Sequence, residues 1–253
     1  MLADLETECG AVLMERGKQG VSLTSAGLEL LPFAERLCAE FDKIRMKIDD
    51  MNGIQSGTLR IGTFSSVATY RLPDMIAAFN RQYPNIEYEL LLGDYEEIEE
   101  WIARGRVDFG FLRLPTRNTF DVIELEKDEQ LAVLPKDHPL AQAEAFPVRA
   151  LTDYPFIMLE KGVKAEITDI FIRNGLTPHP KYTTFDDYAV MAMVEKGLGV
   201  AILPSLILQG TNRNIAVKPL DVPAYRTIGV AMKNRRELSP AADRFLQFLP
   251  FSV

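Results

Sequence analysis

The stretch LADLETECGAVLMERGKQGVSLTSAGLELLP, residues 2–32, decides the fold of the amino-terminal part of the chain. Its first apolar residues keep helical spacing, and Gly10 is placed to end that helix because glycine adopts the left-handed cap conformation without penalty. Short strands are expected on either side of the turn at residues 17–20. Thr24 then suits the N-cap of a second helix. A helix, a two-stranded basic wing and a second helix together predict the later part of a winged helix-turn-helix.

The second helix is expected to run from about residue 25 to residue 51, which makes a rod of about 40 Å. Its apolar residues alternate spacings of four and three, the pattern of a helix that pairs with another along its length. A helix that packs only on its own domain is the alternative. We favour self-association into a homodimer or homotetramer, because the apolar seam is narrow and the other face is highly charged. The residues expected in this dimerisation seam are Leu30, Ala34, Leu37, Phe41, Ile44 and Ile48.

Strand and helix patterns alternate through the rest of the chain, which predicts an α/β fold. The rhythm restarts near Gln130, so two similar halves are expected. One strand near Gln130 enters the second half, and another near Ile228 leaves it. Two such crossing segments make a hinge over a cleft. We assign residues 58–128 and 229–253 to the first half and residues 129–228 to the second.

The composition is ordinary for a globular protein, with 47% apolar and 25% charged residues. No apolar run approaches the roughly 20 residues that span a bilayer. Acidic residues interrupt the amino-terminus, so no secretory signal is predicted. We therefore expect a cytoplasmic protein in which Cys9 and Cys38 are reduced residues of the core or of an interface.

The net charge of −8 and the pI near 5.0 argue against a general nucleic-acid-binding protein. The wing is nevertheless locally basic, because Arg16 and Lys18 have no acidic residue between them and can contact DNA phosphate. The two histidines, His138 and His179, lie far apart in the sequence. We therefore expect no metal site and no cofactor.

The pattern L-x-x-L-E-x-x-x-G-x-x-L-x-E-R, followed by V-x-L-T-x-A-G, resembles the LysR-type transcriptional regulators. Two departures are Cys9 and Met14, where the family usually has Leu and Phe. The phrases HPLA (138–141) and GLGVAILP (197–204) resemble the family's second effector subdomain, so the resemblance covers the whole chain. The matching amino-terminal positions are Leu2, Leu5, Glu6, Gly10, Leu13, Glu15, Arg16, Val21, Leu23, Thr24, Ala26 and Gly27.

The resemblance implies a partial winged helix-turn-helix over residues 1–24 and a linker and dimerisation helix over residues 25–52. A periplasmic-binding-like effector domain of two α/β subdomains then follows. The family's first helix and the first turns of its recognition helix, which reach base edges in the major groove, have no counterpart in this sequence. The chain as written is therefore expected to lack specific operator binding.

The function implied is that of a regulator of double-stranded DNA. A small-molecule effector enters the cleft between the subdomains and changes the geometry of the DNA-bound oligomer. The alternative is a stand-alone small-molecule-binding or oligomerising protein without specific DNA binding. An enzyme on the same fold is a third possibility, but the sequence shows no catalytic constellation, so we do not expect an enzyme.

Ligands of open α/β sheets bind at the carboxyl ends of strands. The family's loop that matches Ser65 and Ser66 holds polar effector groups, often a carboxylate. Each serine taken alone is equally well explained as a helix N-cap, and we favour effector contact for the loop as a whole. Arg113 and Lys161 could add positive charge or could be solvated rim residues. The full set of expected effector-binding residues is Ser65, Ser66, Asp94, Arg113, Lys161, Gly162 and Asp187.

Overall fold

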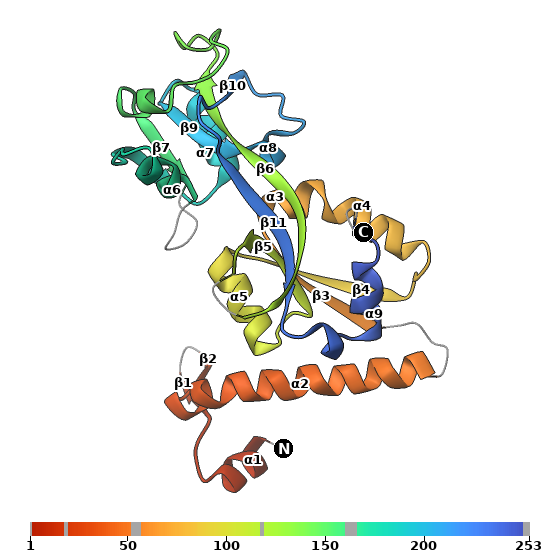
Figure 1. Cartoon of the computed structure of the whole chain (residues 1–253). Helices are drawn as coiled ribbons and strands as arrows, with labels where there is room; N and C mark the ends of the chain where they lie inside the picture. The colour runs from red at the N-terminus through yellow and green to blue at the C-terminus, as the bar shows by residue number, and fades with distance from the viewer. Residues whose placement is uncertain (1, 18–19, 52–56, 117–118, 160–165, 250–253) are drawn as a thin grey trace.

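The structure, a computed structural model, describes residues 2–17, 20–51, 57–116, 119–159 and 166–249. Helix α1 (Leu2–Cys9), strands β1 (Met14–Gly17) and β2 (Gly20–Leu23), and helix α2 (Ser25–Met51) form the amino-terminal part, which lies outside the α/β body (Figure 1). The predicted order of helix, hairpin and long helix is confirmed. Glu6 ties α1 to the hairpin, because its carboxylate accepts hydrogen bonds from the backbone N–H groups of Leu13 and Met14 at 2.8 and 3.1 Å.

The start of α2 is held against the hairpin by two small residues. Thr24 Oγ1 accepts a hydrogen bond from the N–H of Gly27 at 3.0 Å and donates to the carbonyl of Val12 at 2.7 Å. A Cβ atom on Gly27 would lie 2.1 Å from the carbonyl oxygen of Leu13, closer than any real contact. Glycine at this position therefore lets the helix and the hairpin approach each other.

Helix α2 carries an apolar row that faces away from the body. Leu37, Phe41 and Ile44 are 72%, 58% and 57% exposed, and Leu30 and Ala34 are exposed as well. The side chain of Ile48 lies outside the described residues. Another face of α2 packs on helices α5 and α9 of the body. The helix therefore contacts its own domain and leaves the predicted dimerisation seam uncovered.

The body is built on one long path of strands in the order β4-β3-β5-β11-β6-β9-β7-β8, with β10 added beside β6. Strand β6 has 15 residues and pairs with β11 along its first part and with β9 and β10 along its last part. The bounds are β3 (Gly57–Thr63), β4 (Ile86–Leu92), β5 (Phe109–Leu114), β6 (Asp121–Pro135), β7 (Phe156–Leu159), β8 (Pro180–Thr184), β9 (Val200–Pro204), β10 (Ile215–Pro219) and β11 (Tyr225–Met232).

Helices cover the strands on both sides of this crossing (Figure 1). Their bounds are α3 (Ser65–Tyr70), α4 (Leu72–Asn80), α5 (Tyr95–Arg104), α6 (Glu166–Arg173), α7 (Asp187–Glu195), α8 (Ser205–Leu208) and α9 (Pro240–Leu246), with short 3-10 turns at Val148–Thr152 and Arg235–Glu237.

Two separate apolar cores define two subdomains. The core of subdomain I contains Phe79, Phe109 and Phe245, and that of subdomain II contains Phe146 and Phe156. Strands β6 and β11 run side by side from one subdomain to the other (Figure 1). The α/β fold with two subdomains is thus confirmed, while the residue boundaries assigned to the halves stay predictions.

Both cysteines, Cys9 and Cys38, are free and exposed to solvent. The core position considered for them is therefore wrong. Within the described ranges, no helix combines the length and the apolar character that crossing a membrane requires.

Candidate functional site

A buried ion pair joins the two crossing strands. Arg226 on β11 lies directly opposite Asp128 on β6 in the antiparallel register. The guanidinium donates from Nε and Nη2 to the same carboxylate oxygen, at 2.9 and 2.6 Å. Their side chains are only 5% and 2% exposed, so the two charges are satisfied by each other and by neighbouring polar groups rather than by water.

The other oxygen of Asp128 holds the start of helix α8, whose residues pack in both cores. It accepts hydrogen bonds from the hydroxyl of Ser205 at 2.8 Å and from the N–H of Leu206 at 3.0 Å. These two residues begin helix α8, which packs against α3 of subdomain I. Asp128 therefore fixes the first turn of α8 to the crossing strands.

Arg226 reaches subdomain I. Its Nη2 donates to the hydroxyl of Ser66 at 2.8 Å and its Nη1 donates to the hydroxyl of Tyr95 at 3.0 Å. The guanidinium also lies over the ring of Phe64, 5.0 Å from its centre, and Phe64 contacts Tyr95 edge-on at 5.2 Å. One side chain thus connects the crossing strands to the starts of α3 and α5.

The electrostatics keep this cluster in one protonation state. Burial raises the pKa of Tyr95 and outweighs the lowering by Arg226, and Glu166 raises this pKa further. Burial lowers the pKa of Arg226, but Tyr95, Glu166 and Asp128 raise it more, so the net direction is upward. Tyr95 remains a neutral hydrogen-bond donor and Arg226 remains charged throughout the physiological range.

A cavity of about 30 Å³ opens beside this cluster, between the two subdomains. That volume is about one water molecule's share of the liquid. On its wall, the amide nitrogen of Gln130 donates to a carboxylate oxygen of Glu166 at 2.6 Å. The lining residues are Tyr95, Gln130, Leu159, Glu166, Ile167, Asp187, Pro204 and Arg226.

Two of the expected effector-binding residues lie at this cavity or in its cluster. Asp187 is buried in the wall, and Ser66 bonds Arg226. Ser65 is the first residue of α3 and is partly exposed. The N-cap of α3 is Phe64, without a side-chain hydrogen bond. The alternative in which Ser65 or Ser66 is only an N-cap is therefore wrong.

The other expected residues have different surroundings. Asp94 is the N-cap of α5 and forms a capping box with Glu97, with bonds of 2.8 and 2.9 Å. Arg113 on β5 pairs with Asp169 on α6 at 3.5 Å and so bridges the two subdomains. Lys161 and Gly162 lie outside the described residues. Effector contact by this set stays a prediction.

Comparisons with known proteins agree on one family. The family model described as LysR substrate binding domain matches residues 52–250, a range that holds both cores and the cavity. This chain belongs to the LysR family of transcriptional regulators. The HTH-type transcriptional regulator YvbU of Bacillus subtilis is 30% identical over 249 residues, covering 97% of this chain and 85% of YvbU. The probable regulator LrrA of Synechococcus elongatus is 33% identical over 253 residues, covering 98% of this chain and 84% of LrrA.

Solved structures agree with this assignment. A mutant OxyR of Corynebacterium glutamicum, bound to H2O2, is 28% identical, with a TM-score of 0.69 over 98% of this chain and 80% of OxyR. Full-length OxyR of Pseudomonas aeruginosa has a TM-score of 0.73 over 98% of this chain and 82% of that chain at 21% identity, a likeness of fold. YvbU and LrrA are both named as HTH-type transcriptional regulators.

Sequence reasoning missed the residues at the centre of the site in this LysR regulator, Arg226 and Asp128 foremost. Gln130 and Glu166 were missed as well. One signal was Arg226, the single charged residue of β11, whereas β6 carries several charged residues and its pattern does not single out Asp128. The contact between Asp128 and Arg226 spans 98 positions of sequence, so no local pattern joins them.

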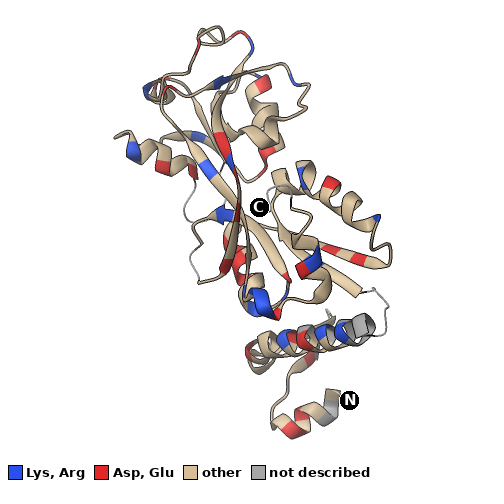
Figure 2. Cartoon of the chain, turned by 45° about the vertical axis from the view of Figure 1, so that its right-hand side comes forward, with Lys and Arg blue, Asp and Glu red and all other residues tan. Residues whose placement is uncertain are grey.

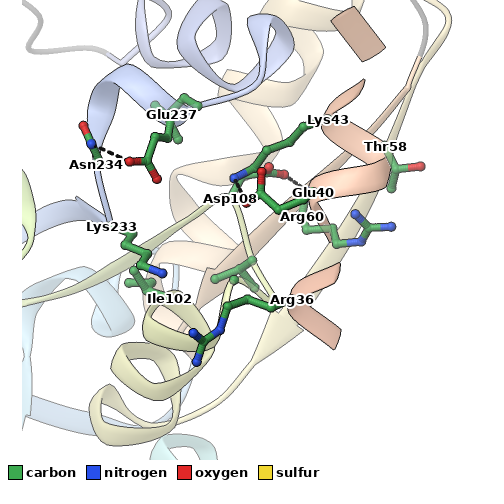
Figure 3. Close-up of a pocket in the computed structure, with 13 residues that line it drawn as sticks. Arg36, Glu40, Lys43, Thr58, Arg60, Ile102, Asp108, Lys233, Asn234 and Glu237 are labelled. Atoms are coloured by element: carbon green, nitrogen blue, oxygen red, sulfur yellow. Dashed lines mark hydrogen bonds and ion pairs between the residues drawn. The ribbon is translucent and has the colours of Figure 1, made fainter. Parts of the chain in front are cut away.

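A second cavity, of about 40 Å³, separates α2 from subdomain I of the regulator (Figure 3). Its wall is strongly charged on both sides. Glu40 and Lys43 of α2 form an ion pair at 3.0 Å, and Asn234 donates to Glu237 at 2.7 Å on the facing segment. Lysines and arginines are mixed with acidic residues along α2 (Figure 2). This mixture of positive and negative side chains is typical of a helix that packs on its own domain. A ligand site whose side chains all carry the same charge would look different.

The wing is a separate candidate site, because it is the part of the chain expected to contact DNA phosphate. The backbone of Arg16 lies in β1, in the hairpin register opposite Val21. The side chain of Arg16 and all of Lys18 lie outside the described residues. Phosphate contact by these two residues stays a prediction.

Proposed function

We propose that this LysR-family regulator senses a small-molecule effector in the cavity between its two subdomains. Effector binding then changes how the DNA-bound oligomer is arranged. The observation that carries this proposal is the polar cavity, walled by both subdomains, beside the ion pair of Arg226 and Asp128 on the crossing strands. A ligand at such a place contacts both moving parts, and differential affinity for their two arrangements is what shifts an equilibrium.

The size of the cavity sets a condition on this mechanism. A cavity of about 30 Å³ is too small for an organic effector. Binding therefore requires the subdomains to move apart around β6 and β11. The ion pair of Arg113 with Asp169, which joins the two subdomains directly, changes when the subdomains separate.

The partners follow from the same regulator function. The exposed seam on α2 supports a homodimer or homotetramer, since Leu37 and Phe41 would otherwise remain in water. Arg16 and Lys18 of the wing would contact the phosphates of double-stranded DNA. The regulator would act in the cytoplasm and without enzymatic turnover.

The test uses the full chain and a library of small carboxylates, amines and neutral polar compounds, screened by thermal stabilisation. Ser66→Ala removes the hydroxyl that bonds Arg226, and Thr69→Ala, at an exposed position of the same helix α3, is its matched control. We expect a hit whose affinity falls at least fivefold in Ser66→Ala and not in Thr69→Ala. The hit should also change the oligomer's scattering profile. A library without hits, or hits equally tight in both variants, would count against this cavity.

A further inference from the structure

Two hydrogen-bond acceptors on the wall of the cavity have no partner. Oε1 of Gln130 and Oε1 of Glu166 are buried, and neither accepts a hydrogen bond from any described residue. Gln130 is 2% exposed, and its amide nitrogen is already committed to the other oxygen of Glu166. Its remaining oxygen therefore lies in the wall as an unsatisfied acceptor. Buried acceptors in native proteins are almost always paired, so these two indicate a missing donor.

Among the described residues that line the cavity, two donors besides Gln130 stand out, and the first of them, the hydroxyl of Tyr95, is hydrogen-bonded to Glu166. The guanidinium of Arg226 has five N–H groups. Four hydrogen bonds, to Asp128, Tyr95 and Ser66, already engage it. The lining is thus rich in acceptors, and its principal donor, Arg226, is already hydrogen-bonded to residues of the crossing strands and of subdomain I.

The charges of the lining residues also favour a ligand group that donates hydrogen bonds. Glu166 and Asp187 line the cavity as carboxylates, while the positive charge of Arg226 is balanced by its ion pair with Asp128. Asp187 has interactions of its own and is counted here only for its charge. An anionic group placed in this cavity would face two carboxylates, whereas a cation would be stabilised by them.

We propose that the effector enters this cavity with a protonated amine, which donates to Gln130 Oε1 and Glu166 Oε1. This inference rests on the proposed function, because it names the chemical class of that effector. An ammonium group carries three donors and is close to a water molecule in size. The group itself fits the cavity of about 30 Å³, and the rest of the effector requires the subdomains to separate. A carboxylate elsewhere on the effector is compatible with this placement of the amine.

The experiment compares three probes of similar size on the full chain at matched ionic strength: propylammonium, propionate and propionamide. Thermal unfolding and calorimetric titration measure binding, since a ligand that binds only the folded state raises its stability with concentration. We expect propylammonium to give a saturable rise in the unfolding temperature, and propionate to give none. Propionamide tests whether a neutral donor is sufficient, and we expect it to bind at least fivefold more weakly than propylammonium.

Two variants test the acceptors. Glu166→Gln and Gln130→Met each keep the approximate size of the side chain, and each should weaken propylammonium at least tenfold. Glu129→Gln is the matched control, because Glu129 precedes Gln130 on β6 and successive side chains of a strand point to opposite faces. It should leave the affinity unchanged. The comparison of probes on the unaltered chain needs no variant and stands even where a variant fails to fold.

The possible results test the amine assignment separately from the proposed function. Tighter binding of propionate than of propylammonium, or unchanged propylammonium affinity in Glu166→Gln, would overturn the amine assignment and leave effector sensing intact. Absence of binding by all three probes would also overturn it. The proposed function depends separately on the library screen with Ser66→Ala, so the two failures are distinguishable.

Discussion

The guanidinium of Arg226 lies 2.6 Å from the carboxylate of Asp128, and each of these side chains also binds the start of a helix. Asp128 binds the first turn of α8, and Arg226 binds the hydroxyls of Ser66 and Tyr95. The ion pair is therefore a joint between the crossing strands and both subdomains.

Breaking this pair from one side should destabilise the protein strongly. Arg226→Met leaves a buried carboxylate without its partner, and the expected loss is about 3–5 kcal/mol in the free energy of unfolding. Asp128→Asn leaves the guanidinium buried without its counter-charge and should cost a similar amount. Urea unfolding measures both values.

The double variant is the control for this prediction. When both charges are removed together, neither is left unpaired, so the combined loss should be well below the sum of the single losses. Strictly additive losses would show that the two side chains act independently, contrary to the geometry.

The second bridge between the subdomains, Arg113 to Asp169, should contribute far less. Its atoms are 3.5 Å apart and its side chains are 24% and 42% exposed, so water and salt screen the charges. Asp169→Asn should change the free energy of unfolding by less than about 1 kcal/mol. This small effect should disappear at high salt. Urea unfolding at low and high salt checks both statements, and a loss that persists in high salt would contradict them.

Local elements were predictable from the sequence because their signal is local. The strand at Phe156–Leu159 is a continuous apolar run, and α2 carries a heptad pattern from Leu30 onward. The start of helix α3 was harder to place, because this helix has only six residues and its N-cap is Phe64, a residue type without a capping side chain. Short elements held by tertiary contacts leave little trace in a sequence pattern.

The candidate site was predictable only in part, for a different reason. Ser66 and Asp187 lie in the first turns of helices that follow the carboxyl ends of strands. Topology alone places such positions near a cleft. Arg226 and Asp128 lie within strands, where the alternation of side chains along the strand predicts only which face is buried. Their importance comes from the antiparallel register of β6 and β11, which no single segment contains.

The stability of the protein should fall as His138 becomes protonated. Its Nδ1 accepts a hydrogen bond from the N–H of Leu140 at 3.1 Å, and its ring contacts Tyr154 edge-on at 4.3 Å. Burial lowers the pKa of His138 below its ordinary value of 6.5, partly opposed by Asp137. The unfolded chain therefore binds the proton more readily, so stability is complete above the ordinary pKa and is lost as the pH falls below it.

His138→Asn removes this titration and keeps a side-chain acceptor near the N–H of Leu140. Urea midpoints measured from about pH 7 down to about pH 5 should fall more steeply for the unaltered protein than for this variant. The difference between the two profiles isolates the histidine from the carboxyl groups that titrate at lower pH. Parallel profiles would refute the assignment.

The role of Asp94 is separable by two substitutions. As the N-cap of α5 it accepts from the N–H of Glu97, so Asp94→Ala should destabilise the protein by about 1 kcal/mol. Asp94→Asn keeps a capping acceptor and should cost much less. An effector that needs the negative charge of Asp94 would instead bind more weakly to both variants. Unfolding and effector affinity, measured side by side, separate capping from effector contact.

The exposed row on α2 should hold the oligomer together. Leu37 and Phe41 lie one helical turn apart and are 72% and 58% exposed in the isolated chain. Leu37→Glu or Phe41→Glu places a charge in the centre of the predicted seam, and desolvation of that charge should raise the dissociation constant at least a hundredfold. Sedimentation equilibrium should then show monomers at concentrations where the unaltered chain is a dimer or tetramer.

Glu40→Gln, on a neighbouring face where Glu40 pairs with Lys43, is the control and should leave assembly unchanged. Assembly that survives Leu37→Glu and Phe41→Glu together would place the interface elsewhere, because two carboxylates cannot be buried in an apolar helix pair without partners.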